Sequence, residues 1–203
     1  MTFVSSFGRQ IPFSETSCND FPPERANFKE LLAINPNYFG NLPDSQQTPV
    51  FPLSSDTKYE QLKYIGFNAA LSLLEATIQI KLSYSFDGDL CTNGSWEYVR
   101  FFVDYGTGWN GIGYVGVNVH DIANGRDCEK HREKPLIYTL SIPFQPVQNN
   151  CSIPVLPNIR AILSWNAIPT CPTCLPVWGN VVDQHIQAPP TTSNDIIDLV
   201  FGA

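Results

Sequence analysis

The residues that first suggest chemistry are Cys171 and Cys174, which stand three positions apart in the segment IPTCPTCLP. A redox-active pair of this spacing needs the start of a helix, where the helix dipole lowers the pKa of a thiol. Prolines surround this pair and a strand-like segment follows it, so we expect no helix here. A structural zinc site needs four ligands, commonly two such pairs, and the chain has one. The pattern therefore favours a disulfide that closes a small loop or joins each cysteine to a distant one.

The chain has six cysteines, an even number that is typical of a disulfide framework in an oxidising compartment. Sequence alone does not choose among the possible pairings. One alternative is a zinc site in which Cys128 and His131 join the Cys-x-x-Cys pair, which requires the fold to bring them together. The disulfide candidates are Cys18, Cys91, Cys128, Cys151, Cys171 and Cys174.

Histidines next to carboxylates could supply acid-base chemistry. His120 precedes Asp121, and Asp183 lies two residues before His185, a spacing that puts both side chains on one face of a strand. The sequence has no nucleophile elbow and no zinc-protease helix motif. We therefore expect hydrogen-bonded structural histidines, and we predict that the chain is not an enzyme and holds no catalytic residue, cofactor or bound metal.

Carboxylates also gather near the expected turns, where they could bind calcium or stabilise the turn backbone. Turn stabilisation is the commoner role, so calcium binding is the alternative. Paired-carboxylate glycosidase chemistry is disfavoured because nothing in the sequence sets the separation of two carboxyl groups. The carboxylates concerned are Asp87, Asp89, Asp104, Asp121 and Asp127.

The four tryptophans raise the question of ligand stacking. Trp109 lies in the glycine-rich segment YGTGWNGIG, where we expect an exposed turn flanked by Asp104 and Asn110. These three residues form the predicted ligand site, although an exposed loop tryptophan suits a subunit contact equally well. The other three lie in strand-like patterns and are expected in the core: Trp96, Trp165 and Trp178.

The composition is poor in charge. The formal net charge is -7, the isoelectric point is near 4.8, and charged residues make up 15% of the chain. A chain without a basic patch does not bind nucleic acid phosphates, and no apolar run is long enough to span a bilayer. A surface with few charges is less protected against association. We therefore expect a self-associating protein of the cell surface or extracellular space, although no signal peptide is visible.

From residue 57 to 187 apolar and polar residues alternate, which is typical of strands with one buried face. The clearest case is LLEATIQIKL, in which Leu74, Ala76 and Ile78 face one way and the intervening polar residues the other. The segment WEYVRFFVDY is apolar on both faces, as a covered central strand would be. About seven such strands, without helical patterns between them, predict an immunoglobulin-like antiparallel β-sandwich, with a barrel as the alternative.

The two ends differ from this domain. Residues 1–56 are expected to form an N-terminal arm with one short helix, in which Phe28, Leu31 and Leu32 have helical spacing and Pro36 ends the helix. Residues 188–203 are expected to form an extended tail with a Pro-Pro hinge. Its apolar, β-prone residues are assembly candidates: Ile196, Ile197, Leu199, Val200 and Phe201.

Several blocks give the chain a likeness to other proteins. The segments GSWEYVRFFVDYG, VNVHDI, RAILSWN and PVWGN occur in this order, and with them the chain resembles an uncharacterised bacterial β-rich protein family. The resemblance implies a recurring β-rich domain and supplies no activity, substrate or site residue.

These observations favour a non-catalytic structural subunit that self-assembles into an extracellular filament or surface layer, its terminal segments crossing between neighbours. The alternative is a carbohydrate- or calcium-binding β-sandwich module that uses the loops around Trp109 and Asp104.

Overall fold

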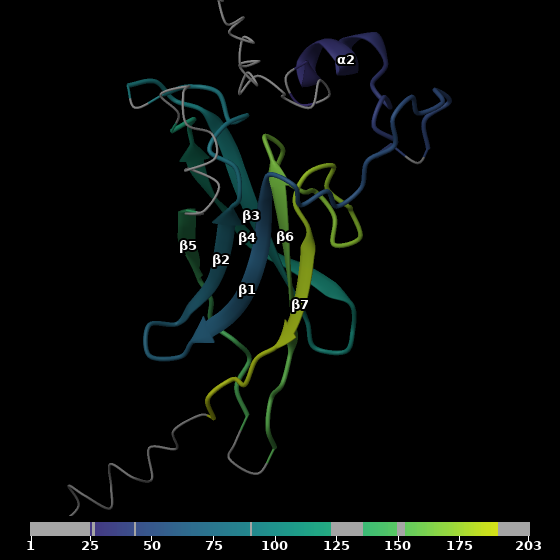
Figure 1. Cartoon of the computed structure of the whole chain (residues 1–203). Helices are drawn as coiled ribbons and strands as arrows, with labels where there is room; N and C mark the ends of the chain where they lie inside the picture. The colour runs from purple at the N-terminus through teal and green to yellow at the C-terminus, as the bar shows by residue number, and fades with distance from the viewer. Residues whose placement is uncertain are drawn as a thin grey trace, which may run out of the picture.

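The structure is a computed structural model, and it describes residues 25, 27–42, 44–89, 91–122, 136–149 and 153–190. The described residues form seven strands and one short helix (Figure 1). The elements are α2 (Phe28–Ile34), β1 (Glu60–Asn68), β2 (Leu73–Ile80), β3 (Ser95–Asp104), β4 (Trp109–Val119), β5 (Leu136–Pro143), β6 (Asn158–Trp165) and β7 (Val181–His185).

The strands make two antiparallel sheets that pack face to face. One sheet has three strands in the order β1-β2-β5, and the other has four in the order β4-β3-β6-β7. This confirms the predicted all-β sandwich. The immunoglobulin-like type is not confirmed, because β4 pairs with β3, whereas constant-type immunoglobulin domains keep their fourth strand in the sheet of the first two.

Alternation along the strands fills the space between the sheets. In β2 the side chains of Leu74, Ala76, Ile78 and Ile80 are buried, as predicted, and their polar neighbours face outward. In β6 every second side chain is buried as well, including the predicted core residue Trp165: Ile159, Ala161, Leu163 and Trp165. Removing this apolar surface from water is the main term that holds the two sheets together.

One predicted turn is wrong in extent. The segment YGTGWNGIG was expected as a glycine-rich turn, yet β4 begins at Trp109 and includes its second half. The turn itself is confined to residues 105–108, where Gly106 and Gly108 have φ values of 93° and 107°. Those two glycines supply the left-handed backbone that a tight reversal needs, so the strand resumes at once.

The described residues of the N-terminal arm cover one end of the sandwich (Figure 1). Helix α2 has seven residues and is the short helix predicted from the sequence. The rings of Phe28 and Phe39 stack with centroids 5.5 Å apart, and Phe39 packs against Trp178 at 5.1 Å. The described arm therefore extends the sandwich core. The tail candidates Ile196 to Phe201 lie outside the described residues.

Candidate functional site

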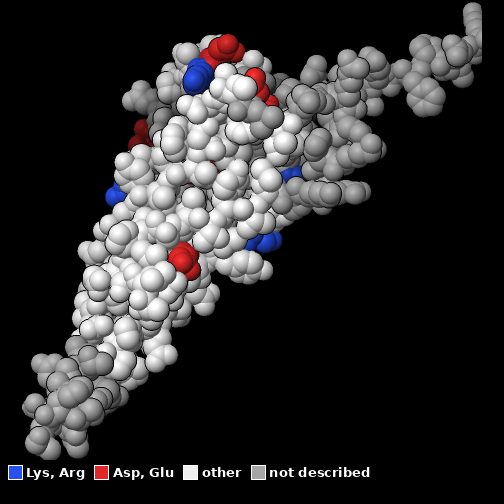
Figure 2. All heavy atoms as spheres, turned by 90° about the vertical axis from the view of Figure 1, so that its left-hand side faces the viewer, with Lys and Arg blue, Asp and Glu red and all other residues white. Residues whose placement is uncertain are grey.

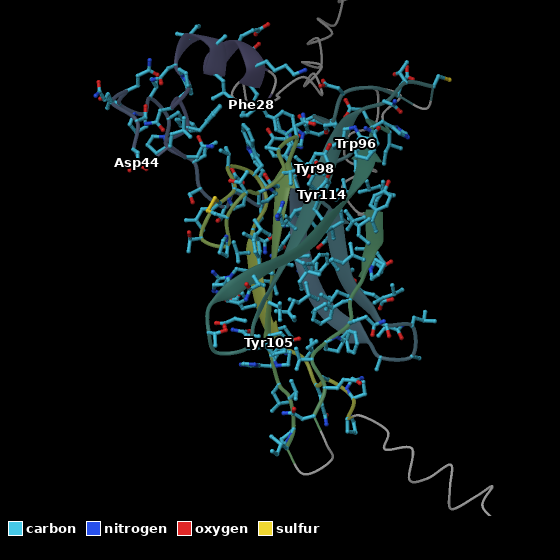
Figure 3. All side chains as sticks on the ribbon, turned by 180° about the vertical axis from the view of Figure 1, so that it is seen from behind. Phe28, Asp44, Trp96, Tyr98, Tyr105 and Tyr114 are labelled. Atoms are coloured by element: carbon cyan, nitrogen blue, oxygen red, sulfur yellow. A yellow bond between two sulfur atoms is a disulfide. The ribbon has the colours of Figure 1, made fainter. Side chains whose placement is uncertain are left out.

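An aromatic patch lies on the outer face of the four-stranded sheet. Trp96 and Tyr98 come from β3 and Tyr114 comes from β4, and Figure 3 shows the three gathered toward the end of the sandwich that carries the arm. The rings of Trp96 and Tyr98 are 5.9 Å apart and 12° from parallel, and Tyr114 meets Tyr98 edge-on at 6.2 Å. Trp96 is 43% exposed and Tyr114 51%, so the patch faces solvent in this chain.

The placement of Trp96 corrects the sequence analysis, which put this residue in the core. Residues of β3 alternate, and the inward positions next to Trp96 are taken by Ser95 and Glu97, both buried. A strand that is apolar on both faces does not reveal which face is covered by other elements. Here the outer face is left open at the start of β3.

Gly116 explains why the rings of the patch lie as they do. It pairs with Tyr98 across the two strands, and a Cβ atom at this position would stand 2.7 Å from a ring atom of Tyr98 and 3.3 Å from one of Trp96. The rings therefore lean over the bare glycine backbone, which aromatic residues on neighbouring strands often cover. Any larger residue at position 116 would displace them.

The patch adjoins a side of the molecule on which two sheet edges meet. Among the described strands, β4 ends one sheet and β5 ends the other, and the two are in contact across the sandwich. Neither strand contains an acidic or basic residue. Figure 2 views the side on which β5 lies, and its described surface carries few charged side chains. We call these two edges together with the aromatic patch the β4–β5 side.

The predicted ligand residues have partners within the chain. The Asp104 carboxylate accepts hydrogen bonds from the backbone N–H groups of Gly106 and Gly108, at 2.7 and 2.9 Å. Asn110 donates its side-chain amide to the Gly108 carbonyl. Trp109 is half-buried, with the guanidinium of Arg160 4.5 Å from its ring centre. Each residue thus shapes the β3–β4 turn or the sheet beside it.

Arg160 ties the disulfide loop to the sheet. It forms two hydrogen bonds to the carboxylate of Asp183, at 2.6 and 2.7 Å, and a third to the carbonyl of Pro172. Pro172 lies between Cys171 and Cys174, whose sulfur atoms are at the disulfide distance of 2.06 Å. Of the two disulfide arrangements that the sequence left open, the structure has the one that closes a small loop. It holds a loop that the sheet ladder does not reach.

The other cysteines and the histidines form no centre in the described part of the chain. Cys91 is exposed with a free thiol, and Cys18, Cys128, Cys151, His131 and Asp127 lie outside the described residues. Within the described ranges no group of three metal-ligating side chains occurs. The ring Nδ1 atoms of His120 and His185 lie near backbone carbonyls, at 2.9 Å from Asp121 and 3.4 Å from Leu156.

A depression of about 570 Å³ opens at the end of the sandwich opposite the arm. Asp104, Tyr105 and His185 are among its lining residues, and Figure 3 shows Tyr105 at that end. The Tyr105 hydroxyl accepts a hydrogen bond from the Val147 backbone N–H, and the Asp104 carboxylate accepts hydrogen bonds from the backbone of the β3–β4 turn. The polar groups there thus hold connecting loops in place.

A buried charged cluster lies where the arm meets the sandwich, and sequence reasoning missed it. The Arg25 guanidinium lies 2.7 Å from a carboxylate oxygen of Glu60 and 3.4 Å from one of Glu97. All three side chains are at most 1% exposed. The guanidinium carbon also lies within 6 Å of four aromatic ring centres, those of Tyr59, Phe86, Trp165 and Trp178. We call this cage of rings and carboxylates the Arg25 socket.

A signal for the socket was present in the sequence. Glu60 precedes Leu62 by two residues, and Glu97 precedes Val99 by two, so both acids occupy inward positions of their strands. An acidic side chain at an inward position needs a cationic partner, because an unpaired buried charge is costly. The sequence does not identify that partner, since Arg25 lies outside the segment with alternating strand residues.

The socket holds one cation and two acids. Burial raises the pKa of Glu97 well above its ordinary value, and the neighbouring Glu60 raises it further, while Arg25 opposes both effects. Burial also raises the pKa of Glu60, and Arg25, which lies closer to Glu60 than to Glu97, opposes this effect. Glu60 makes the shorter contact to the guanidinium, so we expect Glu97 to keep its proton to higher pH than Glu60 does.

This protonation predicts a pH dependence of stability. An acid with a raised pKa in the folded state binds a proton more tightly there than in the unfolded chain, so stability falls as the pH rises from the ordinary glutamate value of 4.5 through the folded pKa. The Glu97→Gln variant should lose much of this slope, leaving the part due to Glu60. Urea unfolding from mildly acid to mildly alkaline pH measures it, and an unchanged slope would contradict the assignment.

None of the described helices is long and apolar enough to cross a bilayer. The predicted likeness to a β-rich bacterial family stays a prediction. A comparison with models of known protein families and one with curated proteins find no match to this chain.

Proposed function

We propose that the chain is a non-catalytic structural subunit that self-associates through its β4–β5 side. The observation that carries this proposal is the meeting of two strand edges without charged residues beside an exposed aromatic patch. An extracellular filament or surface layer suits the low charge and the loop disulfide, which forms where the environment is oxidising.

Open strand edges are the groups that would bind a second copy. A strand at a sheet edge presents unpaired backbone N–H and C=O groups, and proteins that must stay monomeric usually protect such edges with charges, bulges or proline. The β5 sequence LIYTLSIP has no charge, and its one proline, Pro143, is its last residue. Its edge therefore suits the addition of a strand from another chain. The tail segment Ile196 to Phe201 is our candidate for that strand.

The aromatic patch supplies the side chains that anchor such a contact. Tryptophan, tyrosine and arginine are enriched at the centres of protein interfaces, and lysine, glutamate and aspartate are depleted there. Trp96, Tyr98 and Tyr114 provide rings that are already ordered by contact with one another, so little side-chain entropy is lost on association.

Lysine substitutions on the β4–β5 side test the proposal. Thr139→Lys on β5 and Tyr114→Lys on β4 should each reduce self-association by at least tenfold, because a buried unpaired ammonium opposes an apolar contact. The matched control is Tyr64→Lys, which changes a 69% exposed tyrosine on β1, at the other edge of the three-stranded sheet. Electron microscopy and analytical ultracentrifugation measure assembly. Equal assembly by all three variants would reject this side as the interface.

Removal of residues 191–203 tests the tail separately. We expect a folded chain that no longer forms long assemblies, because the acceptor edge of β5 remains while its donor strand is lost. Undiminished filaments would remove the tail from the mechanism and leave only edge and patch contacts.

The second candidate is a carbohydrate-binding module, and the same aromatic patch favours it, since exposed tryptophan and tyrosine rings stack on sugar faces. A glycan array with the Thr139→Lys chain distinguishes the two, because this chain is expected to lack the β5 edge contact and to keep an intact patch. Binding to a glycan that Trp96→Ala abolishes would favour the carbohydrate function. The loop around Trp109 and Asp104 is no longer the preferred site for it.

A further inference from the structure

The Arg25 socket is built entirely by the sandwich. Glu60 belongs to β1, Glu97 to β3 and Trp165 to β6, while Trp178 stands just before β7. The arm contributes the guanidinium that fills it, and the arm rings of Phe28 and Phe39 pack on Trp165 and Trp178. An arm that left the sandwich would therefore leave behind two carboxylates and several aromatic faces, which together attract a guanidinium.

Polar atoms in the socket remain without partners. The second oxygen of Glu60, the second oxygen of Glu97 and the indole N–H groups of both tryptophans are buried and make no hydrogen bond within the described residues. The carboxyl oxygens are hydrogen-bond acceptors, which favour a ligand with several donors, whereas the indole N–H groups are donors that a guanidinium does not pair. A guanidinium has five, whereas an ammonium has three.

The arm is a self-contained unit. Its backbone N–H groups at Leu31, Val50 and Leu53 all donate to carbonyls within the arm, as do those at Asn35, Tyr38, Gly40, Ser45 and Phe51. Among the described residues, the first backbone bond from the arm to the sandwich comes at Ser55, which donates to the Pro176 carbonyl. Ser55 also has a φ of 54°, a left-handed backbone that serine adopts rarely. The connection is thus one short segment, and its backbone is strained in the folded-back form.

We propose that the Arg25 socket is an arm-acceptor site that binds Arg25 of a second copy when two chains exchange their arms. Exchange of a self-contained element across a strained hinge is a low-cost route to an oligomer, because every contact of the closed form is remade in the other chain. The inference does not need the β4–β5 side. It deepens the proposed self-association by naming a second contact.

A pair of complementary variants tests the exchange. Both carry Thr139→Lys, which removes the β5 edge contact, so failure of the edge proposal and failure of the exchange are seen separately. One chain carries Arg25→Ala and keeps an intact socket, and the other carries Glu60→Gln and keeps an intact arm. The mixture should form a mixed dimer in native mass spectrometry at least tenfold more than either chain forms a dimer of itself. No mixed dimer would overturn the exchange.

Chemical rescue keeps the test decisive if the Arg25→Ala chain is poorly folded. Millimolar guanidinium should raise the melting temperature of this chain but not that of the unmodified protein. It should also leave the Arg160→Ala control unchanged, because the side chain removed there is partly exposed. Where a variant is unfolded alone, folded signal recovered only on refolding the two together supports the exchange. Rescue by guanidinium without mixed dimers would show that the socket binds only the arm of its own chain. Absence of both the rescue and the mixed dimers would reject the socket as a guanidinium site.

Discussion

The Arg25→Ala chain is expected to lose about 3 to 5 kcal/mol of its free energy of unfolding, the cost typical of removing one partner from a buried ion pair. Glu60 and Glu97 would remain in the interior without the cation that faces both of them. The lost packing of the guanidinium against the aromatic cage adds to this cost. Urea unfolding followed by tryptophan fluorescence measures the change.

Arg160→Ala is the matched control for that experiment. Arg160 also pairs with a carboxylate and lies over a tryptophan, yet its side chain is 21% exposed and that of Asp183 is 40% exposed. A pair that water can reach contributes at most about 1 kcal/mol. Equal losses in the two variants would mean that the Arg25 socket is open to water, and the argument for a buried cage would fail.

Trp178→Ala is expected to cost about 3 to 5 kcal/mol, the range measured for truncating a buried aromatic side chain. Trp178 is 1% exposed, and its ring meets those of Phe28, Phe39 and Trp165 at 5.1 to 5.3 Å. Its removal would open a cavity between the arm and the sandwich. The melting transition should therefore shift and the arm should become sensitive to proteases.

Trp96→Ala provides the contrast within the same chain. Its side chain lies on the open outer face, so its loss should change the free energy of unfolding by less than about 1 kcal/mol. Thermal unfolding of the two variants side by side measures the difference. A large loss at Trp96 would show that the aromatic patch serves stability, which would weaken its use as an interface.

Alternation predicted the sandwich because burial between two sheets imposes a period of two on every strand. Leu74, Ala76 and Ile78 were assigned correctly for this reason. The same rule does not say what covers the outer face of a sheet. Trp109 was expected in the open and lies under Arg160, while Trp96 was expected inside and lies in the open. Those outcomes depend on the disulfide loop and on the ends of strands, which leave no periodic signal.

The arm shows a second limit. Its helix was predicted from the spacing of Phe28, Leu31 and Leu32, but the expectation that the arm would cross to a neighbour concerns a contact that no single chain reveals. In the described residues the arm packs on its own sandwich through Arg25 and Phe39. A charge partner about 35 positions away from its carboxylate is a long-range property of the fold, and no local pattern encodes it.

The two indoles of the socket have an optical consequence. Trp165 and Trp178 stand 5.2 Å apart with their planes nearly perpendicular. Chromophores so close and so skewed share their electronic excitation, and such coupling produces paired bands of opposite sign in circular dichroism. Because the Arg25 guanidinium lies against both rings, the circular dichroism of the two tryptophans reports whether Arg25 occupies the socket.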